Sequence, residues 1–90
     1  MERKDNKSGA VLTASILEKR GFERDEFPDD DGDPVIIWEK DGVEIYEHVH
    51  SGGFSFCTRT RPDNSFKSGI GIDTENNLEN LYYALTSKEL

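Results

Sequence analysis

The residues best suited to chemistry lie in the middle of the chain. His48 and His50 alternate along a predicted strand, so both side chains point to one face, and Cys57 follows on the next strand. Two imidazoles, a thiolate and either Glu44 or water would make a zinc site, and Cys57 with His48 is formally a nucleophile with its base. The spacing matches no established four-ligand zinc pattern, and no group that would orient the histidine is recognisable. We therefore expect no metal, no cofactor and no enzymatic activity.

A second candidate is the acidic stretch 25–33, which contains five aspartates and one glutamate. Alternating carboxylates are typical of calcium loops, but an EF-hand needs glycine at its sixth position and glutamate at its twelfth. Counted from Asp29, glycine stands fourth and the twelfth residue is Lys40. Like charges repel, and prolines flank the run, so we predict a solvated loop rather than a calcium site.

The elements that would position these residues centre on the stretch 35–72, which predicts four antiparallel strands. Asp41-Gly42 separates two runs with β propensity and is a strong signal for a type I′ turn of two residues. Such a turn fixes the register, with the expected cross-strand pairs Lys40–Val43, Trp38–Ile45 and Ile36–Glu47. If Gly52-Gly53 is a second two-residue turn, the expected cross-strand pairs are His48–Cys57, Tyr46–Arg59 and Glu44–Arg61. A shift of that turn by one residue would change these partners.

The third connection, at residues 61–65, leads to a strand that contains Gly69 and Gly71. Glycines inside a strand indicate an edge, a bulge or a close approach by another backbone.

Side-chain alternation separates two faces of this sheet. The first face is predicted to hold Ile36, Trp38, Val43, Ile45, Phe54, Phe56, Phe66, Ile70 and Ile72. The second is predicted to hold Val35, Ile37, Tyr46, His48, Cys57, Arg59 and Lys67. Because the second face mixes apolar, aromatic and cationic side chains, we expect it to bind a protein partner, an anionic small molecule or a second copy of the chain. The alternative is an ordinary solvated face.

Arg59 separates these two interpretations of the second face. An exposed pair contributes about 0.2–1 kcal/mol, so Arg59→Ala should barely change stability if the face is solvated. If the face is a binding site, the same change should cost on the order of 2 kcal/mol of binding.

Two helices are predicted, over 13–20 and 74–87. Thr13 is a good N-cap and Gly21 a good end for the first helix. In the second, apolar residues recur at helical spacing on one stripe. With both helices on the first face, the chain forms a two-layer α+β domain in the order α-β-β-β-β-α. The expected core includes Leu17, Trp38, Phe54, Phe56, Ile70, Leu81 and Leu85, and residues 1–9 are expected to form an arm.

Composition narrows the function. The chain has 90 residues, a net charge of −8 and one cysteine. One domain is expected, and its acidity argues against direct nucleic-acid binding, which needs a basic surface. A single cysteine fits a reducing compartment. Neither a signal peptide nor an apolar run long enough for a bilayer is recognisable, so we expect a cytoplasmic protein without membrane contact.

The ending Leu78–Leu90, which contains LYYALTSKEL, resembles the tails of small uncharacterised proteins from Bacteroidetes genomes and their phages. Those proteins often end in a string similar to LYxALTGKEL, from which Ser87 departs. The stretches Leu17–Glu23 and Asp41–Glu47 are similar to them too, so the resemblance covers about half of the chain. It implies a phage or mobile-element context and no known activity, and it transfers no functional residues.

Two functions are therefore expected. The first is a non-enzymatic binding module that uses the second sheet face, acts as a homo-oligomer and has a counter-defence role if the phage context holds. The alternative is an inhibitor whose acidic surface imitates nucleic acid toward a basic host protein.

Overall fold

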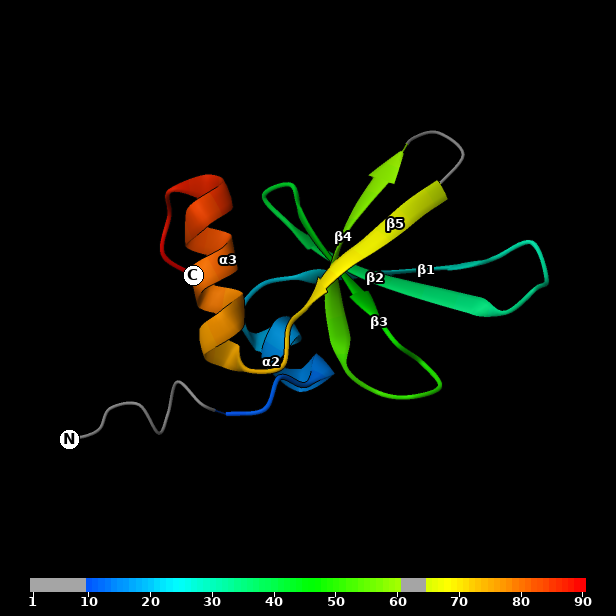
Figure 1. Cartoon of the computed structure of the whole chain (residues 1–90), viewed down its shortest axis with the longest axis horizontal. Coiled ribbons are helices and arrows are strands. Elements are labelled where there is room, and N and C mark those ends of the chain that lie inside the picture. Colours follow the sequence, from blue (N-terminus) through cyan, green and yellow to red (C-terminus); the bar gives the residue numbers. More distant parts are fainter. Residues whose placement is uncertain (1–9, 61–64) are drawn as a thin grey trace.

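In the part of the chain that the structure describes, the protein folds as a five-stranded antiparallel sheet with one helix before it and one after it, an α+β architecture (Figure 1). The computed structural model describes residues 10–60 and 65–90. The strands lie side by side in chain order, so the sheet is a meander. The elements are α2 (Ala14–Lys19), β1 (Glu23–Pro28), β2 (Pro34–Lys40), β3 (Val43–Glu47), β4 (Phe54–Thr60), β5 (Ser65–Gly71) and α3 (Glu75–Thr86).

β1 occupies part of the stretch that was predicted to be a solvated loop. It pairs with β2 along its whole length, with Phe27 opposite Val35 and Asp25 opposite Ile37. Its many charged residues have low β propensity, but an edge strand tolerates them. Pairing with β1 also satisfies backbone groups of β2, whose middle residues are buried. The prediction of four strands was therefore wrong, and only residues 29–33 remain as the connecting turn.

The hairpin of β2 and β3 is confirmed. Its turn residues both have positive φ, 53° at Asp41 and 85° at Gly42, as a type I′ turn requires. The register contains all three predicted pairs. Trp38 Nε1 donates to Glu47 Oε1 at 2.9 Å, so the polar end of this buried indole has a partner.

The connection between β3 and β4 is longer than the predicted two-residue turn and runs from 48 to 53. Glu44 lies opposite Cys57, and Tyr46 lies opposite Ser55. The predicted pairs His48–Cys57 and Tyr46–Arg59 are therefore wrong, and Arg61 lies outside the described residues. Cys57 lies opposite Glu44 and not opposite His48, so β4 is shifted by four residues along β3 from the predicted register. Because side chains alternate with a period of two, a shift by an even number of residues leaves each β4 side chain on its predicted face. Phe54 and Phe56 accordingly lie on the first face, as predicted.

β5 is an edge strand with a bulge, two features that its glycines indicated. Cys57 of β4 pairs with Ser68, whereas Ser55 pairs with Gly71, so two residues of β5 stand opposite one of β4. At Gly69 a Cβ would lie 3.5 Å from the backbone oxygen of Phe56. The connection at 61–64 lies outside the described residues.

The bulge reverses the side-chain alternation of β5, and this corrects two predictions. Phe66, opposite Arg59, lies on the second face and packs there, not on the first. Lys67, opposite Thr58, points to the first face and is exposed, so it does not belong to the second face. Beyond the bulge, Ile72 is buried on the first face, as predicted.

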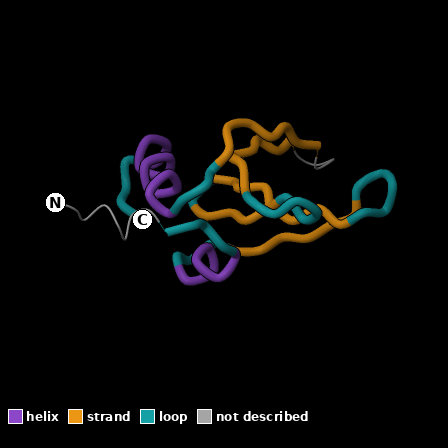
Figure 2. Tube along the Cα trace, turned by 60° about the horizontal axis from the view of Figure 1, so that its bottom comes forward, coloured by secondary structure: helices purple, strands orange, loops and turns teal. Residues whose placement is uncertain are grey.

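Both helices pack on the first face of the sheet, as predicted, and Figure 2 shows them gathered at one end of it. Thr13 caps α2 by accepting from the N–H of Ile16, and Thr74 caps α3 by accepting from that of Asn77. The main core contains Leu12, Leu17, Phe22, Ile36, Trp38, Val43, Ile45, Phe54, Ile72, Leu78 and Tyr82.

Polar contacts at the rim of this core fix α3 to its neighbours. The guanidinium of Arg20, just after α2, donates to Glu75 and, at 2.7 Å, to Glu79. The Tyr82 hydroxyl donates to the carboxylate of Asp41 in the β2–β3 turn. This hydrogen bond lowers the pKa of Asp41 and raises the pKa of Tyr82.

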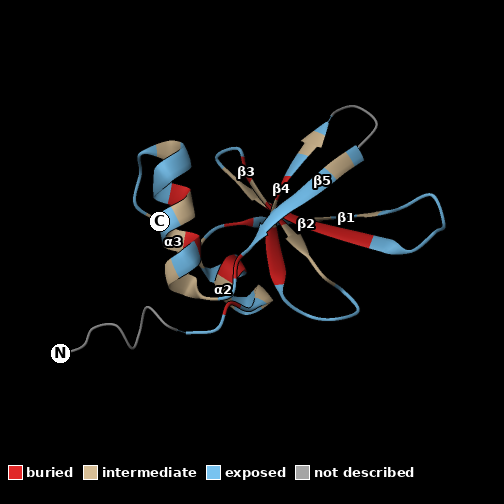
Figure 3. Ribbon diagram, in the orientation of Figure 1, coloured by how far each residue is buried: buried red, intermediate tan, exposed pale blue. Residues whose placement is uncertain are grey.

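The first face is covered only in part. Leu81 and Phe56 are partly buried, whereas Ile70 and Leu85 are 70% and 52% exposed. The prediction that Ile70 and Leu85 are buried was therefore wrong. Because the helices gather at one end, β5 stays exposed along most of its length (Figure 3).

A second, smaller core lies on the opposite face, which neither α2 nor α3 covers. Val35, Ile37 and Cys57 are buried there at 4%, 0% and 2% exposure. Three aromatic side chains pack against them, Phe27 from β1, Tyr46 from β3 and Phe66 from β5. On this face, aromatic side chains shield the small core from solvent, whereas helices shield the core on the first face.

Candidate functional site

Arg59 lies at the centre of the second face, and its side chain is only 1% exposed. Nη1 donates to Asp25 Oδ2 at 2.7 Å, and Nε donates to Glu44 Oε2 at 3.0 Å. Nη2 is 2.9 Å from that same Glu44 oxygen and 4.0 Å from Oε1 of Glu39, both ion-pair contacts. The guanidinium lies over the ring of Phe27, 5.8 Å from its centroid. Within residues 10–60 and 65–90, Arg59 is the one Lys or Arg of this face, and carboxylates and an aromatic ring surround it.

The contact between Arg59 and Asp25 joins two strands that are not neighbours. In a flat sheet β4 and β1 would be three strand spacings apart, about 14 Å. The contact, together with Phe27 and Phe66 packing on one small core, indicates that the sheet curls around the second face. Burial lowers the pKa of Arg59, but hydrogen bonds to Asp25 and Glu44 outweigh it, so the pKa is raised overall.

The remaining predicted site residues divide between the small core and its margin. Val35, Ile37 and Cys57 are buried, so they offer no surface to a partner. Tyr46 is half-buried and touches the rings of His48 and Phe66, with centroids 4.8 and 4.9 Å apart. With Lys67 on the other face, the predicted combination of apolar, aromatic and cationic side chains is not an exposed patch.

The histidine and the cysteine of the predicted zinc or nucleophile pair are not neighbours. His48 Nε2 lies 2.6 Å from Ser55 Oγ, a hydrogen bond at the margin of the small core. Cys57 faces Glu44, about 13 Å along the strand from the position opposite His48. Burial, followed by the negative charge of Glu44, raises the pKa of the Cys57 thiol to about 11. A buried, protonated thiol without a nearby imidazole is a structural residue.

The described residues contain a different polar surface on the hairpin of β1 and β2. We call residues 23–40 the acidic hairpin. It carries eight acidic and two basic residues, a net charge of −6 out of −8 for the whole chain. In Figure 1 its turn points away from both helices. Sequence reasoning found these acidic residues but placed most of them in a loop instead of an ordered hairpin.

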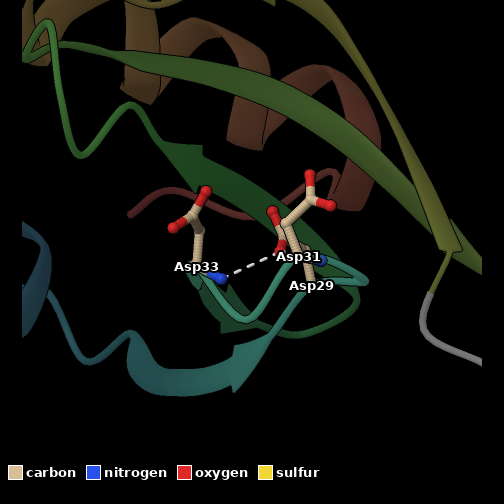
Figure 4. Close-up of side chains that lie close together, drawn as sticks. All are labelled: Asp29, Asp31 and Asp33. Atoms are coloured by element: carbon tan, nitrogen blue, oxygen red, sulfur yellow. Dashed lines mark hydrogen bonds between the residues drawn. The ribbon is translucent and has the colours of Figure 1, made fainter.

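Asp29 organises the turn of the acidic hairpin. Its Oδ1 accepts from the backbone N–H of Asp31 at 2.8 Å and from that of Asp33 at 2.9 Å, the second of which is dashed in Figure 4. Backbone bonds within residues 29–33, and Gly32 with φ of 86°, complete the turn. The carboxylates of Asp29, Asp31 and Asp33 all lie within 4.8 Å of one another and are exposed. Oxygen ligands of this kind suit calcium, which takes six to eight of them.

Comparison of the chain with models of protein families, with curated proteins and with solved structures finds no match. The function must therefore be argued from the surfaces of the α+β domain itself. Within residues 10–60 and 65–90, neither helix is long and apolar enough to cross a membrane.

Proposed function

We propose that the protein is a small non-enzymatic binding module whose acidic hairpin engages a cationic surface of a protein partner. The observation that carries the proposal is the concentration of charge, a net −6 on residues 23–40, on a hairpin that extends away from the helices. A cluster of one sign attracts a partner of the other sign over long distances and raises the association rate.

The order of the hairpin supports a binding role over mere solubility. β1 is paired with β2 at every residue, and Asp29 fixes the turn through two hydrogen bonds. Alternate residues on a strand are about 6.8 Å apart, so Glu23 and Asp25 share one face at a set spacing, and the bond from Arg59 to Asp25 helps to hold β1 in place. Groups that are already ordered lose little conformational entropy on binding, which favours affinity.

The second sheet face supports a ligand site less well. An anionic molecule would have to compete with Asp25 and Glu44 for the guanidinium of Arg59, which is almost fully buried. Removing either carboxylate from a buried cation is costly. We therefore assign the partner to the hairpin and a supporting role to Arg59, because this side chain ties Asp25 of β1 to β4.

A narrower candidate is nucleic-acid mimicry, in which the partner is a protein that normally binds phosphates. It is favoured by the backbone order of the hairpin, because the carboxylates of β1 lie on a paired strand and Asp29 fixes the turn through its hydrogen bonds. If the tail resemblance reflects a phage or mobile-element origin, such a partner is a basic host protein and the role is counter-defence. Competition between duplex DNA and this protein for the same basic partner distinguishes mimicry from other electrostatic binding.

The test compares two variants of equal net charge. One carries Asp30→Asn, Asp31→Asn and Asp33→Asn in the hairpin turn, and Asp29 is left in place because it holds the turn. The control carries Glu18→Gln, Asp73→Asn and Glu89→Gln, three exposed carboxylates outside the hairpin. The probe is a fluorescent oligolysine peptide, titrated at low and at physiological salt.

We expect the hairpin variant to lose at least about tenfold in affinity and the control less than about threefold, with a shallower salt dependence for the hairpin variant. Equal losses would mean that binding follows net charge and not the hairpin, and would contradict the proposal.

A further inference from the structure

The search for a second surface leads to the part of the first face that the helices leave open. Leu81 and Leu85 are separated by one helical turn, so they lie on the same side of α3. Leu81 lines a hollow of about 330 Å³ with Ile70 and Ile72 of the β5 end, and Leu85 lines one of about 340 Å³ with Phe56 and the β2–β3 turn. The two hollows share no lining residue, but Leu81 and Leu85 place them one helical turn apart along the same side of α3. The Phe56 ring lies near the backbone of Gly69, the neighbour of Ile70, where a Cβ would be 3.8 Å from it.

We call this region the α3 groove and define it by Phe56, Ile70, Leu81 and Leu85. Two of its side chains, Ile70 and Leu85, stand out into water, at 70% and 52% exposure. A surface of this kind has both apolar projections and apolar hollows. Large apolar side chains exposed together mark an interaction surface more often than isolated ones do.

We propose that the α3 groove is the interface of a homodimer, in which Leu85 of each copy enters the hollow beside Ile70 of the other. A two-fold interface needs a patch that is complementary to itself, and a patch with both projections and hollows meets this condition. The occupant is a second copy because of how charge is distributed over the molecule.

An acidic protein normally resists self-association, since like charges repel. Here, however, residues 23–40 carry −6 of the total −8, which leaves a net −2 for the rest of the chain. The hairpin turn also lies at the end of the molecule opposite the helices (Figures 1 and 2). Beside the groove both signs are present, because Asp41, which lines the hollow with Leu85, lies 4.0 Å from Lys88. Two copies can therefore meet at the groove while their acidic hairpins stay apart.

The dimer does not depend on the proposed function, but it adds to it. A dimer joined at the α3 groove would present two acidic hairpins, and bivalent engagement raises avidity without any new contact.

The test is the mass of the full-length protein in solution, measured by sedimentation velocity from about 10 µM to about 1 mM, the range in which weak dimers dissociate. Leu85→Glu and Ile70→Glu each place a charge in the groove. Tyr83→Glu is the matched control, because Tyr83 is 58% exposed on the other side of α3 and lines a different hollow. Thermal melting of all three checks that the fold is kept.

We expect a wild-type dimer that persists at high salt, as an apolar interface should. Leu85→Glu and Ile70→Glu should each weaken it at least about 100-fold, and Tyr83→Glu less than about threefold. A wild-type protein that stays monomeric up to 1 mM, or a dimer that survives both groove variants, would overturn the proposal. In the monomeric case, the groove would not be a homodimer interface, and a different protein would be its candidate occupant.

Discussion

Arg59 is the residue on which the second sheet face depends. Its side chain is buried, and it bonds Asp25 of β1 and Glu44 of β3 from its place on β4. A buried guanidinium contributes through packing as well as charge, and here its plane also covers the ring of Phe27. The small core of Val35, Ile37 and Cys57 lies beneath this arrangement.

We predict that Arg59→Met lowers the free energy of unfolding by about 3 kcal/mol, because it leaves two carboxylates without their cation and opens the small core. The melting temperature should fall by more than about 10 °C. Lys67→Met is the control, since Lys67 is exposed on the other face, and its effect should stay within about 0.5 kcal/mol. Similar small effects of both substitutions would show that Arg59 is a surface residue after all.

Cys57 provides a second readout for the same variant. With a pKa of about 11, the thiol is almost entirely protonated at pH 8 as well as buried, so it should react slowly with iodoacetamide. Because folding raises the pKa of this thiol, the free energy of unfolding depends on pH. The contribution of the neutral thiol to stability is fully present below the ordinary pKa of 9.0 and is lost as the pH rises toward 11. Arg59→Met should speed the reaction at pH 8 by opening the core.

The role of Arg59 was predictable only in part. Its place on the second face was predicted, but the predicted register set it opposite Tyr46, and the observed register brings its side chain to Glu44. Its burial depends on Asp25 and Phe27, which belong to a strand whose charged sequence predicts a loop. The sequence therefore indicated an exposed cation, whereas the fold surrounds it with carboxylates.

At the scale of elements, local turn chemistry was predictable and long-range pairing was not. Asp41-Gly42 needs positive φ at both residues, and this alone determined the β2–β3 register. The cap of the first helix, Thr13, was likewise predictable from residue type, whereas the structure decides in favour of Thr74 for α3. The β3–β4 register and the formation of β1 depend on contacts between strands that no short stretch encodes.

The end of α3 offers a test of one such local rule. Ser87 caps the helix in the left-handed conformation, with φ of 62°, at a position where glycine is the usual residue in protein helices. Ser87→Gly should therefore stabilise the protein by about 0.5–1 kcal/mol, since glycine adopts this conformation without steric cost.

The matched control is Ser15→Gly inside α2, which should destabilise by a similar amount, because glycine in a helix interior is unfavourable. Chemical denaturation of both variants gives the comparison. A loss of stability in Ser87→Gly would mean that the serine side chain contributes more than its backbone conformation costs.

The whole molecule is polarised. The two helices, which pack on the main core, lie toward one end, and the turn of the acidic hairpin lies at the other (Figures 1 and 3). The α+β class was predictable from hydrophobic periodicity, but this separation of charge from apolar surface was not. It arises because the helices cover only part of the first face and because β1 holds acidic residues in a paired strand.

The most direct test of the central claim, that the acidic hairpin is the binding element, is to map where a cationic probe touches the protein. Uniformly ¹⁵N-labelled protein would be titrated with the oligolysine peptide, and amide shifts followed by nuclear magnetic resonance. We predict perturbations concentrated at residues 25–34, with little change at Glu18, Glu89 and the α3 groove. Shifts spread evenly over all exposed carboxylates, or centred on the second face around Tyr46 and His48, would contradict the account.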